Sequence, residues 1–207
     1  TAHQSEFAMV VRVAIFERPD VRADLDARSM AMRRLANRPS WLPPGDACPA
    51  QVMPPTPLRD LRTSLSACEG GRLFDCLLEC EKGSAGSCYV AAFEVEASKH
   101  DAQGAELLYR QACRFGLASG CTNAAAARKL TSGRMDDCSV QTFETVCMRA
   151  EDPWACTMYG MALIKGEPEK RDIARARHVL GISCEKSRAD PACATAAALL
   201  KELDETH

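Results

Sequence analysis

The sequence predicts an all-α protein: a right-handed α/α solenoid of about four disulfide-stapled helix-pair repeats, preceded by an irregular amino-terminal extension. Three observations lead to this fold class. The chain contains 12 cysteines in 207 residues, most of those cysteines recur at a nearly constant spacing, and turn signals separate segments of helical length. We expect the extension to cover residues 1–57 and the repeat solenoid to cover residues 58–207.

Four cysteine pairs define the repeat. The two members of a pair are eight residues apart in the first two pairs and nine apart in the last two. The first members follow one another at intervals of 33, 34 and 37 residues, a period that is typical of helical solenoids. The pairs are Cys80 with Cys88, Cys113 with Cys121, Cys147 with Cys156, and Cys184 with Cys193.

The residues around these pairs repeat as well. A small residue stands four positions after each second cysteine, and an apolar residue stands four positions before each first one. Small residues allow two helices to approach closely, and bulky residues fill the space between helix pairs. The small residues are Ala92, Ala125, Gly160 and Ala197, and the apolar ones are Cys76, Tyr109, Phe143 and Leu180. Asp101 and Asp172 each stand four residues before an alanine, where an Asp can cap a helix by accepting hydrogen bonds from backbone N–H groups.

Turn signals place the helices. We expect helices near residues 58–68, 72–82, 87–98, 102–115, 118–131, 137–150, 154–165, 171–186 and 191–204. Each cysteine pair then brackets a turn between two antiparallel helices, which can bring the Cα atoms within the ~4.4–6.8 Å that a disulfide needs. Because an even number of so many cysteines indicates disulfides, which form in oxidising compartments, we expect a periplasmic or secreted protein. The chain lacks an initiator Met, so we expect a processed or trimmed form from which any export signal has been removed.

The remaining cysteines have two candidate roles. Cys68 and Cys76 are eight residues apart with two glycines between them, so we interpret them as a fifth staple. By elimination, Cys48 and Cys138 would join and tie the extension to the middle of the solenoid. Zinc binding is the alternative, but structural zinc sites usually have two to four residues between paired ligands, and the sequence contains no Cys-x-x-Cys. We therefore expect no metal and no other cofactor.

Two segments then resemble a known family. They are Ala112-Cys113-x-x-Gly116-x-x-x-Gly120-Cys121 and Ala155-Cys156, with an Asp four residues before an Ala at Asp101 and Asp172. They resemble Sel-one-like repeats, which are relatives of tetratricopeptide repeats. The closest subgroup is the cysteine-rich secreted bacterial one, in which a disulfide links the two helices of each repeat. The resemblance covers about residues 70–207, although the Gly-rich turn between repeats is degraded and the last two turns carry one extra residue.

This resemblance implies a protein-binding role, because stacked helix pairs form a concave face that binds peptides or domains. Polar residues at expected exposed positions of the first helices are the candidates for that face; the alternative is an ordinary solvated surface. They are Gln103, Glu106, Arg110, Arg114, Gln141, Glu144, Arg175 and Arg177, of which Arg110, Arg114 and Glu144 are our candidate partner-binding residues.

The segment from Phe7 to Phe16 is apolar and rich in β-branched residues. It is either a strand or a short buried helix or tether. A lone strand is unstable in water and would pair with this chain, a second copy or a partner. Its candidate partner-binding residues are Phe7, Val10, Val11, Val13, Ile15 and Phe16. A removed membrane anchor is a further interpretation, so tethering near a membrane is a possible role.

The rest of the extension is predicted to be a helix and a linker. The helix begins at Pro19, ends near Asn37, and either packs on the first repeat or docks a partner. Residues 39–57 then form a semi-rigid extended linker, because prolines disfavour helix. The prolines are Pro39, Pro43, Pro44, Pro49, Pro54, Pro55 and Pro57.

One sequence match concerns catalysis. Ser183-Cys184-Glu185-Lys186 fits Ser-x-x-Lys, and some cysteine-rich members of the resembled family have been described as penicillin-binding proteins or weak β-lactamases. The companion Ser-Asp-Asn and Lys-Thr-Gly motifs are absent, and Cys184 belongs to a staple, so we expect no enzyme.

The predicted function is therefore a non-catalytic scaffold or accessory subunit of an extracytoplasmic bacterial complex. The alternatives are a secreted or periplasmic inhibitor or immunity-type binder, and a penicillin-binding or weak β-lactamase activity. A formal net charge of −2 gives no support for nucleic acid or an anionic membrane as the main partner. We therefore expect a protein partner.

Overall fold

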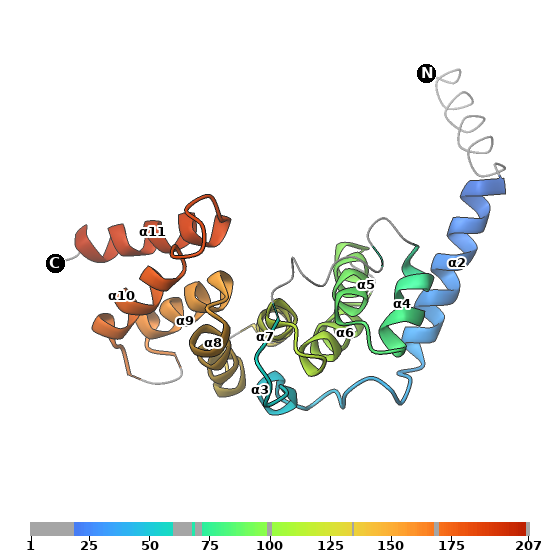
Figure 1. Ribbon diagram of the computed structural model, residues 1–207, viewed down its shortest axis with the longest axis horizontal. Helices are drawn as coiled ribbons and strands as arrows, with labels where there is room; N and C mark the ends of the chain where they lie inside the picture. The colour runs from blue at the N-terminus through green and yellow to red at the C-terminus, as the bar shows by residue number, and fades with distance from the viewer. Residues whose placement is uncertain are drawn as a thin grey trace, which may run out of the picture.

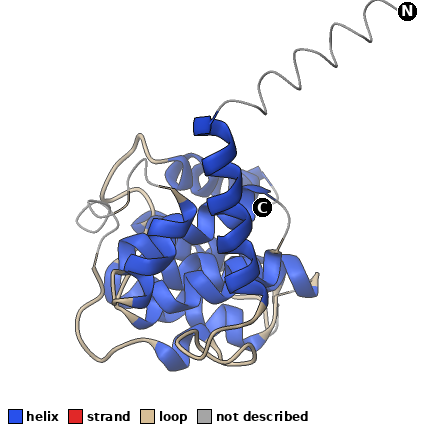
Figure 2. Ribbon diagram, turned by 90° about the vertical axis from the view of Figure 1, so that its right-hand side faces the viewer, coloured by secondary structure: helices blue, strands red, loops and turns tan. Residues whose placement is uncertain are grey.

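The structure, a computed structural model, describes residues 19–59, 68, 72–98, 101–133, 135–167 and 170–205. These residues form helices and loops, and none of them forms a β-strand (Figure 2). The helices are α2 (Pro19–Ala36), α3 (Pro49–Val52), α4 (Leu73–Glu81), α5 (Ala85–Ser98), α6 (Ala102–Arg114), α7 (Ala118–Ser132), α8 (Asp137–Ala150), α9 (Pro153–Lys165), α10 (Ile173–Ile182) and α11 (Pro191–Glu205).

The helices from α4 to α11 follow one another along the long axis of the molecule (Figure 1). Each packs against its neighbour in the sequence, and α2 packs against α4. Two clusters of buried apolar side chains fill this stack, one centred on α4 to α7 and one on α7 to α9. The arrangement is that of an α solenoid, in which neighbouring helices bury one another's apolar faces.

Six disulfides join the cysteines, and no cysteine is free among the described residues. They are Cys48–Cys138, Cys68–Cys76, Cys80–Cys88, Cys113–Cys121, Cys147–Cys156 and Cys184–Cys193, the same pairs that spacing and elimination suggest. In the four repeat staples the Cα atoms are only 4.5–4.7 Å apart. The staples therefore hold the two helices of a pair together at their shared turn.

Aspartates begin four of the helices. Asp101 and Asp172 accept hydrogen bonds from the N–H groups of Gly104 (2.8 Å) and Arg175 (2.9 Å), as their spacing predicts. Asp136 and Asp152 cap α8 and α9 in the same way. These caps set the points at which the chain turns into each helix.

Contacts between successive helix pairs match a small residue with a large one. Gly160 of α9 faces Leu180 of α10 so closely that a Cβ atom at Gly160 would lie 2.6 Å from Leu180 Cγ and Cδ2. Leu180 is fully buried and cannot withdraw into solvent. Ala92, Ala125, Tyr109 and Phe143 are fully buried at the corresponding positions of the earlier pairs, whereas Ala197 on the final helix is exposed.

The substitution Gly160→Ala tests this match. Alanine would stabilise an isolated helix by about 1 kcal/mol relative to glycine. We expect the overlap with Leu180 to outweigh that gain and to lower the free energy of unfolding by about 1–2 kcal/mol. Urea denaturation would measure the change. Leu180→Val, which shortens the opposing side chain, should recover part of it, and a more stable Gly160→Ala variant would contradict the proposed close packing.

The amino-terminal extension, residues 1–57, contains one of the elements that the sequence predicts. The helix expected from Pro19 is present as α2, and its buried residues Ala27, Ala31 and Leu35 lie on one face. The apolar segment 7–16, including Phe7, Val10, Val11, Val13, Ile15 and Phe16, lies outside the described residues. Among the helices described, none is long and apolar enough to cross a membrane.

Candidate functional site

Residues 38–59, which we call the strap, leave the end of α2 and run along the stack to α7 (Figure 1). Within the strap, the short helix α3 contacts α6, α7 and α8. The Cys48–Cys138 disulfide joins the start of α3 to the first turn of α8 across 90 residues of sequence. The sequence predicted a semi-rigid linker here. The structure instead shows a segment docked on its own helices and locked there by a covalent bond.

The helices bind the strap through its main chain. The N–H group of Ala50 donates to Thr142 Oγ1 at 3.2 Å. Arg149, at the end of α8, donates to the carbonyl oxygens of Pro54 (2.8 Å) and Thr56 (2.9 Å). Because these contacts use main-chain groups, they depend on the path of the strap backbone, including the helical turn α3, rather than on particular strap side chains.

The end of the strap continues this pattern. The N–H group of Arg59 donates to the carbonyl of Gly116 at 2.7 Å, and the carbonyl of Arg59 accepts from Ala118 at 3.1 Å. The two bonds form an isolated parallel bridge between Arg59 and Leu117. The helix expected over residues 58–68 was therefore wrong at its start, because the backbone of Arg59 is paired with the α6–α7 turn. Residues 60–67 lie outside the described residues.

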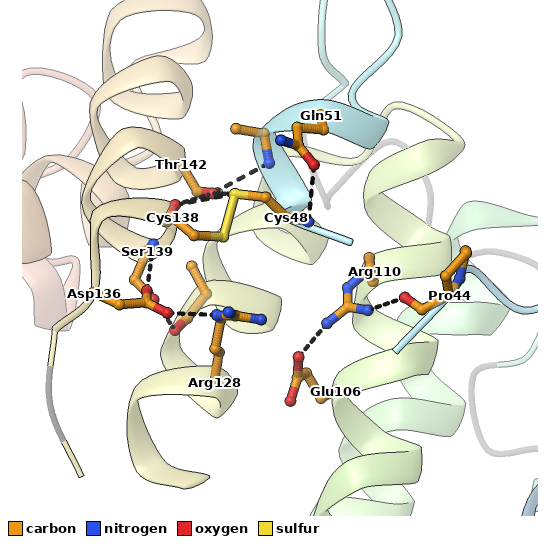
Figure 3. A network of polar contacts seen from close by, with 12 residues as sticks. Pro44, Cys48, Gln51, Glu106, Arg110, Arg128, Asp136, Cys138, Ser139 and Thr142 are labelled. Carbon is orange, nitrogen blue, oxygen red and sulfur yellow. Dashed lines mark hydrogen bonds and ion pairs between the residues drawn. A yellow bond between two sulfur atoms is a disulfide. The ribbon is translucent and has the colours of Figure 1, made fainter. Parts of the chain in front are cut away.

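Arg110 lies beneath the strap, where Figure 3 shows it between Glu106 and Pro44. It is fully buried, pairs with Glu106 one helical turn away, and donates to the carbonyl of Pro44. Burial lowers the pKa of Arg110 and raises the pKa of Glu106, while their mutual attraction opposes both shifts. The expectation that Arg110 and Glu106 are exposed was wrong, because the strap covers this face of α6.

A second polar group anchors the beginning of α8 beside the strap (Figure 3). Arg128 of α7 donates to Asp136 at 2.7 Å, and Asp136 accepts from the N–H group of Ser139 at 2.8 Å. Ser139 in turn donates to the carbonyl of Ala125 at 3.3 Å. These bonds fix α8 on α7, and so position the end of α8 that carries Cys138.

The other two candidate partner-binding residues remain accessible. Arg114 is exposed at the end of α6. Glu144 is partly exposed and pairs with Arg175 of α10. Glu144 lines a groove of about 460 Å³ between α8, α9 and α10, which we call the second groove. It is lined by Asp137, Val140, Gln141, Glu144, Tyr159, Ala162, Leu163, Glu167, Lys170 and Arg175.

A larger open cleft of about 570 Å³ follows the stapled turns. Its walls come from the starts of the second helices α7 and α9, from α5, from the loop before α11 and from the end of the strap. Its volume lies within the range that is usual for binding sites, about 300–1,000 Å³. The lining residues are Leu58, Arg59, Tyr89, Ala118, Ser119, Thr122, Asn123, Ala150, Asp152, Pro153, Trp154, Lys186, Ser187 and Asp190.

Asp152 lies at the floor of this cleft and links two helix pairs. Its carboxylate accepts hydrogen bonds from the N–H group of Ala155 (2.9 Å) on its own helix and from Thr122 Oγ1 (3.0 Å) and Ser119 Oγ (3.2 Å) on α7. Burial raises the pKa of Asp152, although all three hydrogen bonds and the charge of Lys186 favour the ionised form. One side chain thus caps α9 and clamps it to α7.

We expect Asp152→Ala to lower the free energy of unfolding by about 2 kcal/mol, because it removes a helix cap and the carboxylate that two hydroxyl groups of α7 share as acceptor. Asp172→Ala, at the exposed start of α10, is the matched control and should cost about 1 kcal/mol or less.

Because the pKa of Asp152 is raised in the folded state, the contribution of this carboxyl to stability falls as pH rises through the interval above about 3.8. Asp152→Asn should flatten that part of the urea-denaturation pH profile; an unchanged profile would contradict the assignment.

The sequence alone did not identify the cleft. Trp154, 43% exposed at its edge, follows the Asp-Pro pair that we interpreted only as a turn. Asn123 Nδ2 donates to the hydroxyl of Tyr89 at 2.9 Å and joins α7 to α5 along the same wall. The available signal was the Asp-Pro-Trp run at the start of a second helix, because an aromatic residue there points away from the helix pair's core.

The Ser-x-x-Lys match has an unsuitable geometry for a nucleophile. Ser183 is fully buried, and its hydroxyl accepts a hydrogen bond from Thr157 Oγ1 at 3.0 Å. The ammonium group of Lys186 instead donates to the carbonyl of Ala150. A nucleophilic serine needs access to its substrate and a base within hydrogen-bond reach, and the described contacts of Ser183 provide neither.

No family model matches the chain, and no curated protein and no solved structure matches it.

Proposed function

We propose that this protein is a non-catalytic, protein-binding scaffold that serves as an accessory subunit of an extracytoplasmic complex in bacteria. In this proposal the stack is a right-handed solenoid of four Sel-one-like helix pairs, which the cysteine spacing and the matched small and large residues support. Stacks of this kind present long surfaces to protein partners.

The proposed compartment follows from the sulfur chemistry. Six disulfides suggest an oxidising, extracytoplasmic environment. A periplasmic or secreted location is the finer form of this proposal. Five of the six bridges close loops of eight or nine residues, so they make the stack rigid one helix pair at a time. A rigid surface loses little conformational entropy when a partner binds.

The single observation that carries the proposal is the cleft along the stapled turns, with the partly exposed Trp154 at its edge. Trp is enriched among the residues that dominate protein–protein binding energy. The cleft also offers hydrogen-bonding groups from several helix pairs, including Tyr89, Asn123 and Ser187. A partner would therefore bury one aromatic anchor within a polar rim, as is usual at protein interfaces.

Crosslinking mass spectrometry in the native envelope, with co-purification, tests the proposal. We expect a stoichiometric protein partner with crosslinks beside the cleft, and we expect Trp154→Ala to weaken its retention at least tenfold. Phe93→Ala, which removes an aromatic residue that is 56% exposed on α5, is the matched control and should retain the partner.

Two outcomes would contradict the proposal. One is recovery of the chain alone from native envelope under every crosslinking condition. The other is a partner that Trp154→Ala retains as well as the unaltered protein does, which would place the interface away from the cleft. A partner enzyme that this protein inactivates would favour the inhibitor or immunity-type alternative over the accessory subunit.

A further inference from the structure

The strap shows how this helix stack holds an extended, proline-rich segment. Its anchoring side chains come from two adjacent helix pairs: Arg110 of first helix α6 donates to the carbonyl of Pro44, and Thr142 of first helix α8 accepts from the N–H group of Ala50. Arg128 of the intervening second helix α7 interacts electrostatically with Asp46 of the strap. The strap-binding surface is therefore formed by two successive first helices and the second helix between them.

The repeat register identifies a second surface of the same kind. When α6 and α8 are aligned on Cys113 and Cys147, which are 34 residues apart, Glu106 and Arg110 of α6 correspond to Val140 and Glu144 of α8. When α7 and α9 are aligned on Cys121 and Cys156, which are 35 residues apart, Arg128 of α7 corresponds to Leu163 of α9.

All three of these equivalent residues line the second groove, which α10 closes with Arg175. The second groove is thus the strap-binding surface displaced by one helix pair, and no described segment of the chain fills it.

The chemistry of the two surfaces differs in an informative way. Under the strap, Glu106 and Arg128 are charged, and Glu106 pairs with Arg110. At the equivalent positions of the second groove, Val140 and Leu163 provide an apolar floor. Arg175 lies across this floor, 5.2 Å from the centre of the Tyr159 ring, and its side chain remains 46% exposed. The groove therefore combines an apolar floor with a half-exposed guanidinium; one of its nitrogens donates to Glu144, and its other N–H groups suit main-chain carbonyl oxygens.

We infer that the second groove binds an extended, proline-rich segment of a protein partner, in the way that α6, α7 and α8 bind the strap. The strap places Pro49 and Val52 of α3 and the following Met53 on the helices, and the floor of the second groove can accept similar apolar side chains. Proline-rich segments suit such a surface because they are already extended and lose little entropy on binding. This inference rests on the proposed function, since it describes a second contact with a protein partner.

The test uses the oxidised full-length chain and a fluorescein-labelled peptide of residues 43–58 carrying Cys48→Ser, so that it cannot form a disulfide. We expect saturable binding by fluorescence anisotropy, and loss of binding when the prolines of the peptide are replaced by alanine. Gln141→Trp, which places a large side chain at an exposed position of the groove, should weaken binding at least tenfold. Leu163→Asp should do the same by adding a charge to the floor.

The controls separate this site from the cleft and from general damage. Glu94→Trp makes a comparable change at an exposed position of α5 and should bind the peptide normally, as should Trp154→Ala. Absence of peptide binding, or equal binding by Gln141→Trp, would overturn the inference. A dimer in sedimentation that Gln141→Trp dissociates would also overturn it, because a second copy would then occupy the groove. Each result is independent of whether the envelope partner is recovered, so failure of the groove and failure of the proposed function are distinguishable.

Discussion

Replacing Cys48 and Cys138 together by alanine is expected to lower the free energy of unfolding by about 4.5 kcal/mol. This bridge closes a loop of about 90 residues, and the chain-entropy estimate grows with loop length. It is also the bond that covalently joins the strap to α8. We therefore expect the variant to unfold at lower urea concentration and to exchange the strap amides, including that of Ala50, faster than the oxidised protein does.

The staple Cys184–Cys193 is the matched control for this change. Its loop spans only nine residues, so the same estimate gives about 2.6 kcal/mol for the double alanine variant. Because that staple lies at the far end of the stack, its removal should leave amide exchange in the strap unchanged. If the two double variants lost equal stability, or if strap exchange did not increase without Cys48–Cys138, the proposed role of the long-range bridge would be refuted.

Arg110→Met is expected to lower the free energy of unfolding by about 3–4 kcal/mol. The substitution keeps the side chain's apolar volume but leaves the buried carboxylate of Glu106 without its cation and the carbonyl of Pro44 without its donor. Adding Glu106→Gln should restore much of the loss, because the buried position then carries no unpaired charge. Urea denaturation of the two variants would measure this coupling.

The pH dependence gives an independent check on the same pair. Burial already raises the pKa of Glu106, and removal of Arg110 should raise it further. A carboxyl whose pKa is higher in the folded state binds more protons there, so its contribution to stability falls as pH rises. Arg110→Met should therefore be least stable, relative to the unaltered protein, near neutral pH and recover on acidification.

Arg38→Ala is the control for the loss of an ion pair that is not fully buried. It removes the partly exposed pair with Asp101 and should lower the free energy of unfolding by about 1 kcal/mol or less.

The helix stack could be predicted from residue spacing because its determinants are local. A disulfide between residues eight or nine apart needs only two helices and the turn between them, so Cys113 and Cys121 suffice to indicate a stapled pair. Asp101 and Asp172 cap the helices that follow them through bonds to residues three positions on. The match between Gly160 and Leu180 was likewise visible as a repeated pattern of small and large residues.

The candidate sites could be predicted only in part, because they depend on contacts between distant segments. Arg110 has the periodicity of an exposed helical residue, yet a segment more than 60 residues earlier in the chain covers it. The strap is held largely through its main-chain carbonyl oxygens, which every residue type carries. The cleft at Trp154 combines helix starts from several repeats, so no single motif encodes it.

The sequence by itself determined that this protein is a helical stack with stapled turns, because cysteine spacing and capping residues act within one helix pair. Only the tertiary structure decided that the proline-rich segment lies on α6, α7 and α8, and that the cleft and the second groove remain open. The physical reason is that an extended segment carries no periodic pattern and is placed by main-chain hydrogen bonds and one long-range disulfide. The surfaces left for a partner follow from that placement.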